Sequence, residues 1–345
     1  MDLKPECRAT AIGSFPHKNA EEPLVLIVDH LKDIPMWPQL PDRVFIEGMC
    51  PQYSEGLPAV TIDVAGGHIN VDTGPDLPTH LEKFYEQYLT EELEPFAVSA
   101  EYASGLYAYL ERFSGAPGLT AAKGHITGPI TWGLTVSDQD GRAAYYDDML
   151  KDGIVKGLAR KAQWQALQLK RVNDHVIIFI DEPYMQSIGS ATVALREDDV
   201  LESLNEVIAG LHQGEAYAGI HCCGNTDWAL LTRTETDIIN FDAWNYAESL
   251  SLYPREIGDF LEKGGVLAWG IVPNTEIIET LDAGAVITAL RRAMALLAKK
   301  GISETLLLER ALITPSCGCG TLTEAQCAKM IALAAQASDI LRGKN

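Results

Sequence analysis

The residues best suited to chemistry lie in two short cysteine clusters that are far apart along the chain. One cluster is residues 221–223 (HCC), and the other is residues 317–319 (CGC). On a β-strand, side chains at i and i+2 point the same way, so His221 and Cys223 can face a common centre while Cys222 points outward. Imidazole nitrogen and thiolate sulfur are the ligands that tetrahedral Zn2+ favours. The spacing predicts a zinc site; the alternative is buried free cysteines that pack as small apolar residues.

A zinc site of this composition favours chemistry at sulfur. A free thiol has a pKa of about 8.5 and is mostly protonated at neutral pH. Coordination to zinc removes that proton and holds the sulfur as an oriented nucleophile. Two thiolates and one imidazole leave the metal nearly neutral, so a bound substrate sulfur stays electron-rich. Such a site suits alkyl transfer to a thiol better than hydrolysis, which requires a more cationic zinc.

The elements that must position these ligands alternate along the chain between short apolar runs and longer amphipathic segments. Most of the runs are apolar at nearly every position, as in parallel strands buried on both faces. The expected strands are 8–13, 43–47, 124–127, 176–180, 217–221, 237–241, 266–269 and 307–313. The expected helices are about 81–113, 142–172, 198–213, 253–263, 276–300 and 323–342, with Asp198 and Thr323 as N-caps.

This alternation predicts an α/β fold, a single (β/α)8 TIM barrel over residues 1–345. A doubly wound open sheet is the other option, but no G-x-G-x-x-G turn follows any expected strand. Residues 49–78, rich in Gly and Pro, read as a long insertion after the second strand that carries a small hairpin and acts as a partial lid.

Polar and unusual residues gather where the expected strands end. In a barrel, all parallel strands end on one face, and catalytic side chains are found there. Residues distant in sequence are therefore expected to meet at one mouth: Ser14, Glu47, Thr127, Asp181, Glu182, His221, Cys223, Asp242, Asn274 and Cys317.

Charge and cysteine usage limit the partners. The formal net charge is −21, so the surface repels phosphate backbones and anionic lipid, and we expect neither a nucleic acid nor a membrane as partner. The N-terminal residues form no apolar stretch like that of a signal peptide, which favours a cytoplasmic protein. The odd count of 7 cysteines does not fit a secreted disulfide framework.

The motifs resemble a known family. Residues 12–16 (IGSFP) are similar to the opening of the catalytic domain of cobalamin-independent methionine synthase, and 127–131 (TGPIT), 180–183 (IDEP), H-x-C at 221–223 and P-x-C-G at 315–318 follow in that family's order. The segment 221–225 (HCCGN) also resembles methylcobalamin:coenzyme M methyltransferases, a related branch of the uroporphyrinogen decarboxylase superfamily. The resemblance extends from about residue 8 to residue 341.

The resemblance implies roles for particular residues. His221, Cys223 and Cys317 match the zinc ligands. Residues 237–242 (DIINFD) match a strand that ends in a ligating glutamate, so Asp242 takes that place and Glu248 is the second choice.

The resemblance also implies a substrate site for an amino-acid thiol. Ser14 matches the residue that holds the carboxylate of homocysteine, and Asp181 the one that pairs with its ammonium group. The family's H-G-E segment is replaced by residues 46–49 (IEGM), where Glu47 can substitute for the glutamate. This departure leaves the identity of the thiol open.

A second departure concerns the methyl donor. The methionine synthases carry a histidine, thought to act as general acid, where residues 268–274 read AWGIVPN, and the 345 residues contain no extra N-terminal barrel for methyl-folate. The N5 amine of methyl-folate leaves poorly unless it is protonated, whereas Co(I) corrinoid leaves without a proton. We therefore predict a methylated corrinoid, presented by a corrinoid protein, as donor to a small thiol, with methyl-folate less favoured.

Three alternatives remain open. The acceptor thiol could be coenzyme M instead of homocysteine. The barrel could be a metal-free decarboxylase, although it has no Arg-rich N-terminal motif like that of the uroporphyrinogen decarboxylases. Finally, it could be a non-catalytic protein that binds metal or docks a corrinoid.

Overall fold

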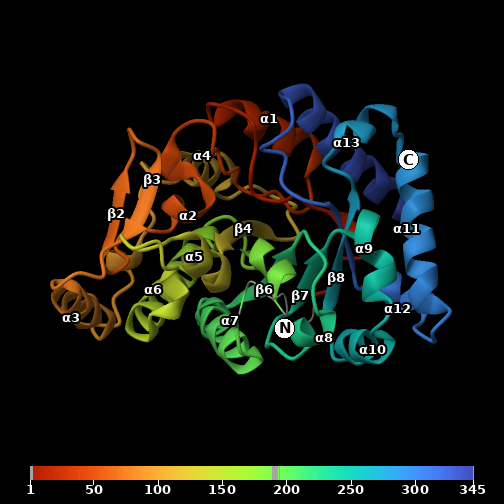
Figure 1. Ribbon diagram of the computed structural model, residues 1–345. Coiled ribbons are helices and arrows are strands. Elements are labelled where there is room, and N and C mark those ends of the chain that lie inside the picture. The colour runs from red at the N-terminus through yellow and green to blue at the C-terminus, as the bar shows by residue number, and fades with distance from the viewer. Residues whose placement is uncertain (1–2, 189–192, 194, 345) are drawn as a thin grey trace.

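The structure, a computed structural model, describes residues 3–188, 193 and 195–344. It is an α/β fold built on a curled parallel sheet that resembles a TIM barrel (Figure 1). Seven strands pair in the order β1-β9-β8-β7-β6-β5-β4. Their bounds are β1 (Arg8–Ala9), β4 (Ala122–Thr127), β5 (Val176–Asp181), β6 (Ala216–Cys222), β7 (Ile238–Phe241), β8 (Val266–Val272) and β9 (Ala311–Pro315).

An extended segment, residues 35–39, lies between the two edge strands of this sheet. On one side Gln39 N–H donates to Gly13 O at 2.9 Å, and Phe15 N–H donates to Gln39 O at 2.8 Å. On the other side Lys123 N–H donates to Pro35 O at 3.0 Å. Isolated parallel bridges join the segment to Ser14 and to Lys123. Residues 35–39 thus connect the β1 edge to the β4 edge.

The second strand was therefore expected in the wrong place. Residues 43–47 form no strand, and Phe45–Glu47 form a short 3-10 helix. The segment that bridges the sheet lies earlier and contains Pro35 and Pro38. Proline has no N–H to donate, so it interrupts a ladder and makes the sequence read as a loop.

Two other expected strands need correction. The extended stretch at 8–13 contributes only Arg8–Ala9 as strand. Residues 307–313 divide between helix α12 (Glu304–Glu309) and strand β9. The remaining expected strands coincide with β4, β5, β6, β7 and β8, with boundaries shifted by a few residues.

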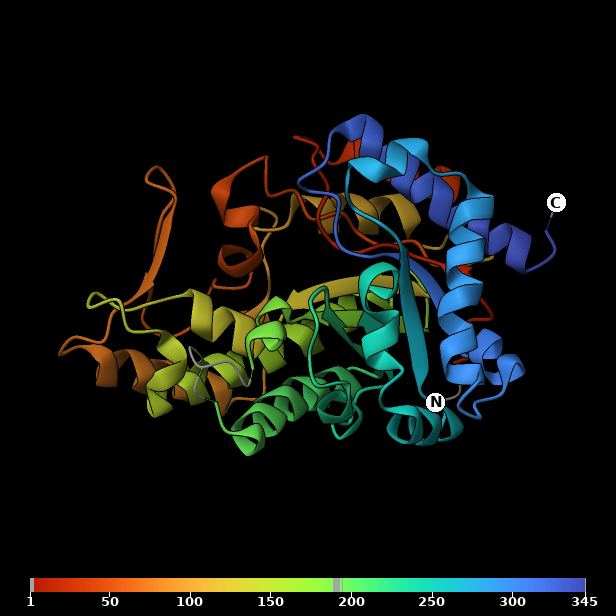
Figure 2. The same cartoon turned by 45° about the vertical axis from the view of Figure 1, so that its right-hand side comes forward.

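Helices cover the outer side of the sheet, as the two views show (Figures 1 and 2). The α-helices of the described residues are α1 (Glu21–His30), α2 (Met49–Gln52), α3 (Leu77–Tyr88), α4 (Ser104–Phe113), α5 (Pro129–Thr135), α6 (Asp148–Leu169), α7 (Glu197–Gln213), α8 (Trp228–Thr232), α9 (Ala243–Leu250), α10 (Pro254–Glu262), α11 (Ala283–Ala298), α12 and α13 (Glu324–Leu341), of which α2 lies in the insertion and α3 packs on α6. The expected helix at 81–113 is two helices, α3 and α4, separated by a 3-10 turn at Glu94–Phe96.

Of the two predicted N-caps, one is confirmed and one is wrong. Thr323 caps α13 in a capping box with Gln326, as predicted. Asp198 is not an N-cap: α7 begins earlier, Arg196 is its N-cap, and Asp198 lies in the first turn. An acidic side chain in the first turn is stabilising as well, through the helix dipole, so composition alone does not separate the two positions.

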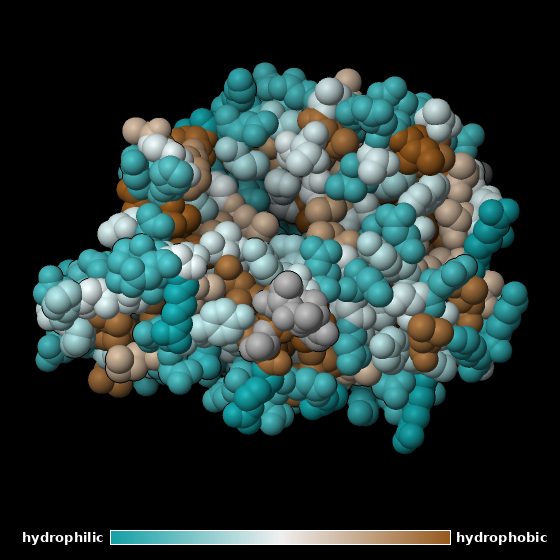
Figure 3. All heavy atoms as spheres, viewed as in Figure 1, coloured by the Kyte–Doolittle hydropathy of each residue, from teal (hydrophilic) through white to brown (hydrophobic). Residues whose placement is uncertain are grey.

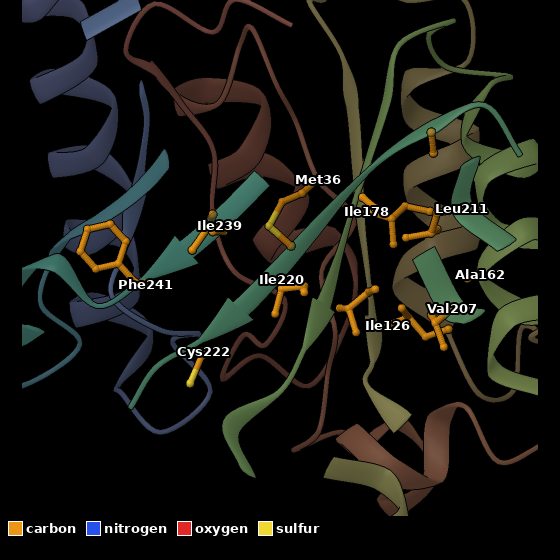
Figure 4. Packing of buried hydrophobic residues seen from close by; sticks show 14 of the residues in the cluster. Met36, Ile126, Ala162, Ile178, Val207, Leu211, Ile220, Cys222, Ile239 and Phe241 are labelled. Carbon is orange, nitrogen blue, oxygen red and sulfur yellow. The ribbon is translucent and has the colours of Figure 1, made fainter. Parts of the chain in front are cut away.

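Strand alternation separates two apolar clusters. Ile178 and Ile220 point toward the helices and pack near Val207 and Leu211 of α7 (Figure 4). The intervening residues Ile177, Phe179 and Tyr217 join a second cluster with Ile238, Val266, Ala268 and Leu312 on the concave side. Because the side-chain period of a strand is 2, the same strands line the interior and the helix layer. The continuous apolar runs of the sequence follow from this.

The insertion at 49–78 contains α2 and an antiparallel hairpin, β2 (Val60–Asp63) with β3 (His68–Val71). The hairpin stands apart from the main sheet (Figure 1). The surface seen from this side is mostly hydrophilic, with a recess near its centre (Figure 3). Among the described residues, no helix has the length and apolar character required to cross a membrane.

Candidate metal centre

The structure brings together three of the predicted ligands. His221 lies near the end of β6, Cys223 directly follows that strand, and Cys317 lies just past the end of β9. One ligand atom from each of the three side chains lies within 4.8 Å of the other two. His221 is buried, and both cysteines are half-buried. Neither cysteine is in a disulfide.

Asn240 orients the imidazole of this group. Its amide N–H2 donates to Ala268 O and to Thr314 Oγ1, each at 2.9 Å. Its Oδ1, with no proton to offer, faces Nδ1 of His221. Nδ1 must therefore carry a proton, which leaves Nε2 as the nitrogen that faces the cysteines and is positioned to bind a metal. This is the arrangement in which a second partner fixes the tautomer of a metal-binding histidine.

The pKa values of the two sulfurs are shifted in opposite directions. The pKa of Cys223 is lowered to about 4, first because the thiol of Cys317 donates a hydrogen bond to it and then because His221 does. The pKa of Cys317 is raised, since it donates to Cys223 and is buried. Burial lowers the pKa of His221. The hydrogen bonds with Cys223 and Asn240, together with the negative charge of Asp181, oppose burial and raise this pKa on balance. A thiolate beside an imidazole fits the donor set of a zinc site.

Asp242 lies near this group but is bound to its own helix. Its carboxylate caps α9, accepting from Asn245 N at 3.0 Å and from Asn245 Nδ2 at 2.6 Å. Burial is the main cause that raises the pKa of Asp242, and the negative charge of Cys223 adds to it. The hydrogen bonds from Asn245 oppose this rise. Glu248 lies on the same helix, in a hollow beside Ile271 and Arg292. The fourth ligand, Asp242 or Glu248, stays a prediction.

Ser14 contacts the loop that carries Cys317. Its carbonyl accepts from Cys319 N at 2.9 Å, and its Oγ accepts from Gly320 N at 3.4 Å. A Cβ on Gly318 would lie 2.2 Å from Ser14 Oγ, so the absence of a side chain at Gly318 permits this approach. Ser14 therefore lies beside a candidate ligand.

Asp181 adjoins the centre from the neighbouring strand. It is the last residue of β5 and pairs in register with His221. Its Oδ1 is buried and has no hydrogen-bond partner among the described residues. Burial raises the pKa of Asp181 to about 6, while His221 and Lys123 oppose that rise. Burial of a carboxylate oxygen without a hydrogen-bond donor costs free energy of desolvation. This atom is therefore available to a cationic or N–H group of a ligand.

Glu47 has structural partners. Its carboxylate accepts from Arg43 Nε at 2.8 Å and from Ser104 N, at the first residue of α4, at 2.6 Å. The side chain is buried. These contacts join the 3-10 helix to α4, and the substrate role of Glu47 stays a prediction.

Two functional candidates were missed in the sequence, Asn240 and His125. Asn240 is the polar residue within an otherwise apolar strand, which is the signal that could have found it. His125 of β4 is buried, stacks on Trp37 with ring centroids 3.8 Å apart, and has no partner for either ring nitrogen within the described part of the chain. It lies on the same face of β4 as Thr127, two residues from the strand end.

A second group with metal-binding residue types consists of His17, Glu22 and Glu324. Both carboxylates are exposed and lie in the first turns of α1 and α13. Acidic residues at these positions stabilise helices through the dipole, which accounts for their presence.

The fold and the site define a TIM-barrel-like α/β protein with a histidine–cysteine–cysteine centre at the strand ends. No protein-family model and no curated protein matches the sequence. Among solved structures, a chain from Listeria monocytogenes described as "Putative Vitamin-B12 Independent Methionine Synthase" matches with a TM-score of 0.55 and 15% identity, over 96% of this chain and 97% of that chain.

A B12-independent methionine synthase from Shewanella sp. W3-18-1, in complex with selenomethionine, matches with a TM-score of 0.45 and 19% identity, over 65% of this chain and 63% of that chain. The full-length likeness to the Listeria structure confirms, at the level of fold, the resemblance to B12-independent methionine synthases that the sequence motifs predict.

Proposed function

We propose that this protein is a zinc-dependent methyltransferase that moves a methyl group from a methylated corrinoid to a small thiol, with homocysteine as the favoured acceptor and methionine as product. The observation that carries the proposal is the convergence of His221, Cys223 and Cys317 from β6 and β9. In the reaction an S–CH3 bond forms and the Co–CH3 bond breaks; the bonding electron pair stays on cobalt, and the thiol proton goes to solvent.

Each residue of the candidate metal centre has a separate role in the proposed reaction. When bound, zinc would lower the pKa of the acceptor thiol so that it reacts as a thiolate. Asn240 keeps the proton of His221 on Nδ1 and so leaves Nε2 toward the two cysteines. The hydrogen bond from Cys317 lowers the pKa of Cys223, so Cys223 is a ready ligand for a divalent ion, whereas Cys317 must lose its proton when the ion binds. Asp242 is our choice for the fourth ligand.

Asp181 favours an acceptor with an ammonium group. Its unpartnered Oδ1 lies in a buried setting one strand from His221, where a cation gains most from a carboxylate. Homocysteine offers an ammonium group to Asp181 and a carboxylate to Ser14. Coenzyme M carries a sulfonate and no ammonium, so the same buried carboxylate repels it. The assignment of homocysteine depends on this contrast.

The donor assignment depends on the chemistry of the leaving group. Residues 268–274 (AWGIVPN), which include the end of β8, contain no titratable side chain that could protonate a folate amine. A corrinoid needs no such acid. We therefore propose a corrinoid protein as the partner that presents the methyl group, and methyl-folate as the alternative donor.

We also propose that residues 1–345 form one (β/α)8 barrel domain in which residues 35–39 serve as the second strand. The bridges from Gln39 to Ser14 and from Met36 to Lys123 support this closure. The insertion at 49–78 follows that strand, on the side where strands lead into the site.

Methyl transfer tested with two donors and two acceptors decides the proposal. Zinc-loaded protein is mixed with methylcobalamin or methyl-tetrahydrofolate, and with homocysteine or coenzyme M. We expect methionine from homocysteine with methylcobalamin, and little turnover with methyl-folate. Robust turnover with methyl-folate alone would overturn the donor assignment, and no methyl transfer in any combination would overturn the function.

The variant Asp181→Ala tests the acceptor assignment in the same assay. Loss of a charged hydrogen-bond partner is expected to raise the KM for homocysteine by about 10-fold or more, equivalent to roughly 1.5–3 kcal/mol. A thiol without an amino group should react at its unchanged rate. An equal loss with both thiols would contradict an ammonium-binding role for Asp181.

A further inference from the structure

A second pair of cysteines lies next to the candidate metal centre and is not used by it. Cys319 follows Cys317 by two residues, and Cys327 lies in the first part of α13. Their Sγ atoms are 2.6 Å apart. Non-bonded heavy atoms are most stable at roughly 3.5–4.0 Å, and a disulfide bond measures about 2.0 Å. The two sulfurs are thus held closer than an ordinary packing contact.

The surroundings hold this pair together. Both side chains are completely buried. Cys319 N–H donates to Ser14 O at 2.9 Å, and Cys327 N–H donates to Thr323 O at 2.8 Å inside the capped first turn of α13. Within the described residues, neither sulfur belongs to a group of metal-binding side chains. The pair has therefore the geometry of a dithiol and not that of a metal ligand set.

We propose that Cys319 and Cys327 form a reversible disulfide that fastens the loop carrying Cys317 to α13. The oxidant is a low-molecular-weight disulfide. One cysteine thiolate attacks that disulfide and forms a mixed disulfide, releasing one small thiol. The second cysteine then attacks the protein sulfur of the mixed disulfide and releases the other small thiol. Two protein thiols are oxidised, one small disulfide is reduced, and the two protons pass to the released thiolates.

Access requires a local opening. The connection between the two cysteines is at the surface, with Thr321, Thr323, Glu324 and Ala325 exposed. Opening of the connection between Cys319 and the first turn of α13 would give a small disulfide access to the two sulfurs. Cys317 is left out of the bond, so the oxidised protein keeps its zinc ligands. The disulfide itself does not depend on the proposed function, and only the zinc-release measurement below rests on the candidate metal centre.

The test is a redox equilibration of zinc-loaded protein in mixtures of reduced and oxidised glutathione. The samples are acid-quenched, alkylated in denaturant and digested, and the peptides are identified by mass spectrometry. We expect a Cys319–Cys327 cross-linked peptide in oxidising mixtures, reversed by excess reduced glutathione. Cys7, Cys50 and Cys222 serve as internal references and stay alkylatable. Alkylation of all 7 cysteines at every ratio, or a bond from Cys317 to any partner, would overturn the proposal.

A second measurement tests the effect on the loop. Zinc release to an excess of chelator is followed in the reduced and oxidised forms of the same protein, and release from the oxidised form should be several-fold slower. The variant Cys327→Ser should release zinc at the same rate in both redox conditions. The variant Cys50→Ser, which alters a buried cysteine elsewhere, should behave as the parent. Equal release rates in both redox forms of the parent would contradict the fastening of the Cys317 loop.

Discussion

At the scale of single residues, Asn240 determines which nitrogen of His221 is free. Both of its amide hydrogens are used by Ala268 and Thr314, so the amide cannot flip and present a donor to Nδ1 of His221. The imidazole of His221 is therefore oriented by Asn240, and the orientation of Asn240 is fixed by Ala268 and Thr314. A metal ligand that arrives with its tautomer and direction set loses less entropy on binding.

The variant Asn240→Ala tests this role. Removing the amide frees the imidazole to adopt either tautomer, and we expect zinc affinity to fall by about 10–100-fold. The measurement is a competitive titration against a chelator of known affinity. Asn173→Ala removes a part-buried amide that donates to Leu119 O far from the centre, and its zinc affinity should be unchanged. An Asn240→Ala protein that binds zinc as tightly as the parent would contradict a positioning role.

At this scale the sequence predicts much of the site. His221 and Cys223 are found by residue type and by the strand period that places them on one face, and Cys317 is found because parallel strands end at the same edge of the sheet. Asn240 and the orphaned oxygen of Asp181 could not be found in this way. Their significance depends on which neighbours lack hydrogen-bond partners, and only packing of several strands determines that.

At the scale of elements, Glu182 fixes the start of α5 next to the site. Its carboxylate accepts from Ile130 N at 2.9 Å, from Thr131 N at 2.8 Å and from Thr131 Oγ1 at 2.6 Å. Burial raises the pKa of Glu182 to about 7, and these three donors oppose that rise. The β5 terminus and α5 are thus joined through one side chain, directly after Asp181.

The variant Glu182→Gln keeps the shape of the side chain but turns one acceptor into a donor. That donor must face an N–H of α5, so we expect a loss of about 1–3 kcal/mol in the free energy of unfolding. Urea unfolding followed by circular dichroism measures it. Glu197→Gln alters an exposed ion pair with Arg233 and should change stability by less than about 1 kcal/mol. Equal stability of both variants would show that Glu182 does not anchor α5.

Element prediction succeeds where the amphipathic pattern is long and fails where it is interrupted. Helices α6, α7, α10 and α13 lie close to the expected ranges. The range 81–113 was read as one helix because its apolar spacing continues across the turn at Glu94–Phe96. Helix α1 was not expected at all, since Pro23 near its start weakens the helical pattern, although proline is tolerated in a first turn.

At the scale of the whole molecule, an ion-pair cluster joins the C-terminal residues to the loop after α1. Asp33, in the loop after α1, pairs with Arg342 at the end of α13 and with Lys344 at 3.4 Å. Burial raises the pKa of Asp33, but the hydrogen bond and charge of Arg342 lower it on balance. The cluster therefore ties α13, which packs against α1 and β9, to the start of the segment that bridges the sheet.

The pH dependence of stability tests this tie. A carboxyl with a lowered pKa in the folded state contributes stability above its unfolded pKa of about 3.9, and that contribution is lost as pH falls through the folded value. Between about pH 5 and 3 the parent should lose more stability than Asp33→Asn, by less than about 1 kcal/mol. Thermal unfolding at a series of pH values measures the difference. Parallel curves for the two proteins would contradict it.

The overall fold was predictable as an alternation of strands and helices, but its closure was not. Local apolar content locates a strand that pairs along its whole length. Residues 35–39 pair only at isolated positions between prolines, and their extended form is imposed by the two edges that they bridge. Such a segment is defined by tertiary contacts, so the strand was expected at 43–47 instead.

The central claim is that one zinc ion is held by His221, Cys223 and Cys317. Metal analysis of protein purified without chelator, combined with X-ray absorption at the zinc edge, tests it most directly. We predict one zinc per chain with two sulfur ligands at about 2.3 Å and the remaining ligands nitrogen or oxygen, and loss of one sulfur or of the metal in Cys317→Ala. Protein without stoichiometric zinc, or a zinc shell that Cys317→Ala leaves unchanged, would contradict the account.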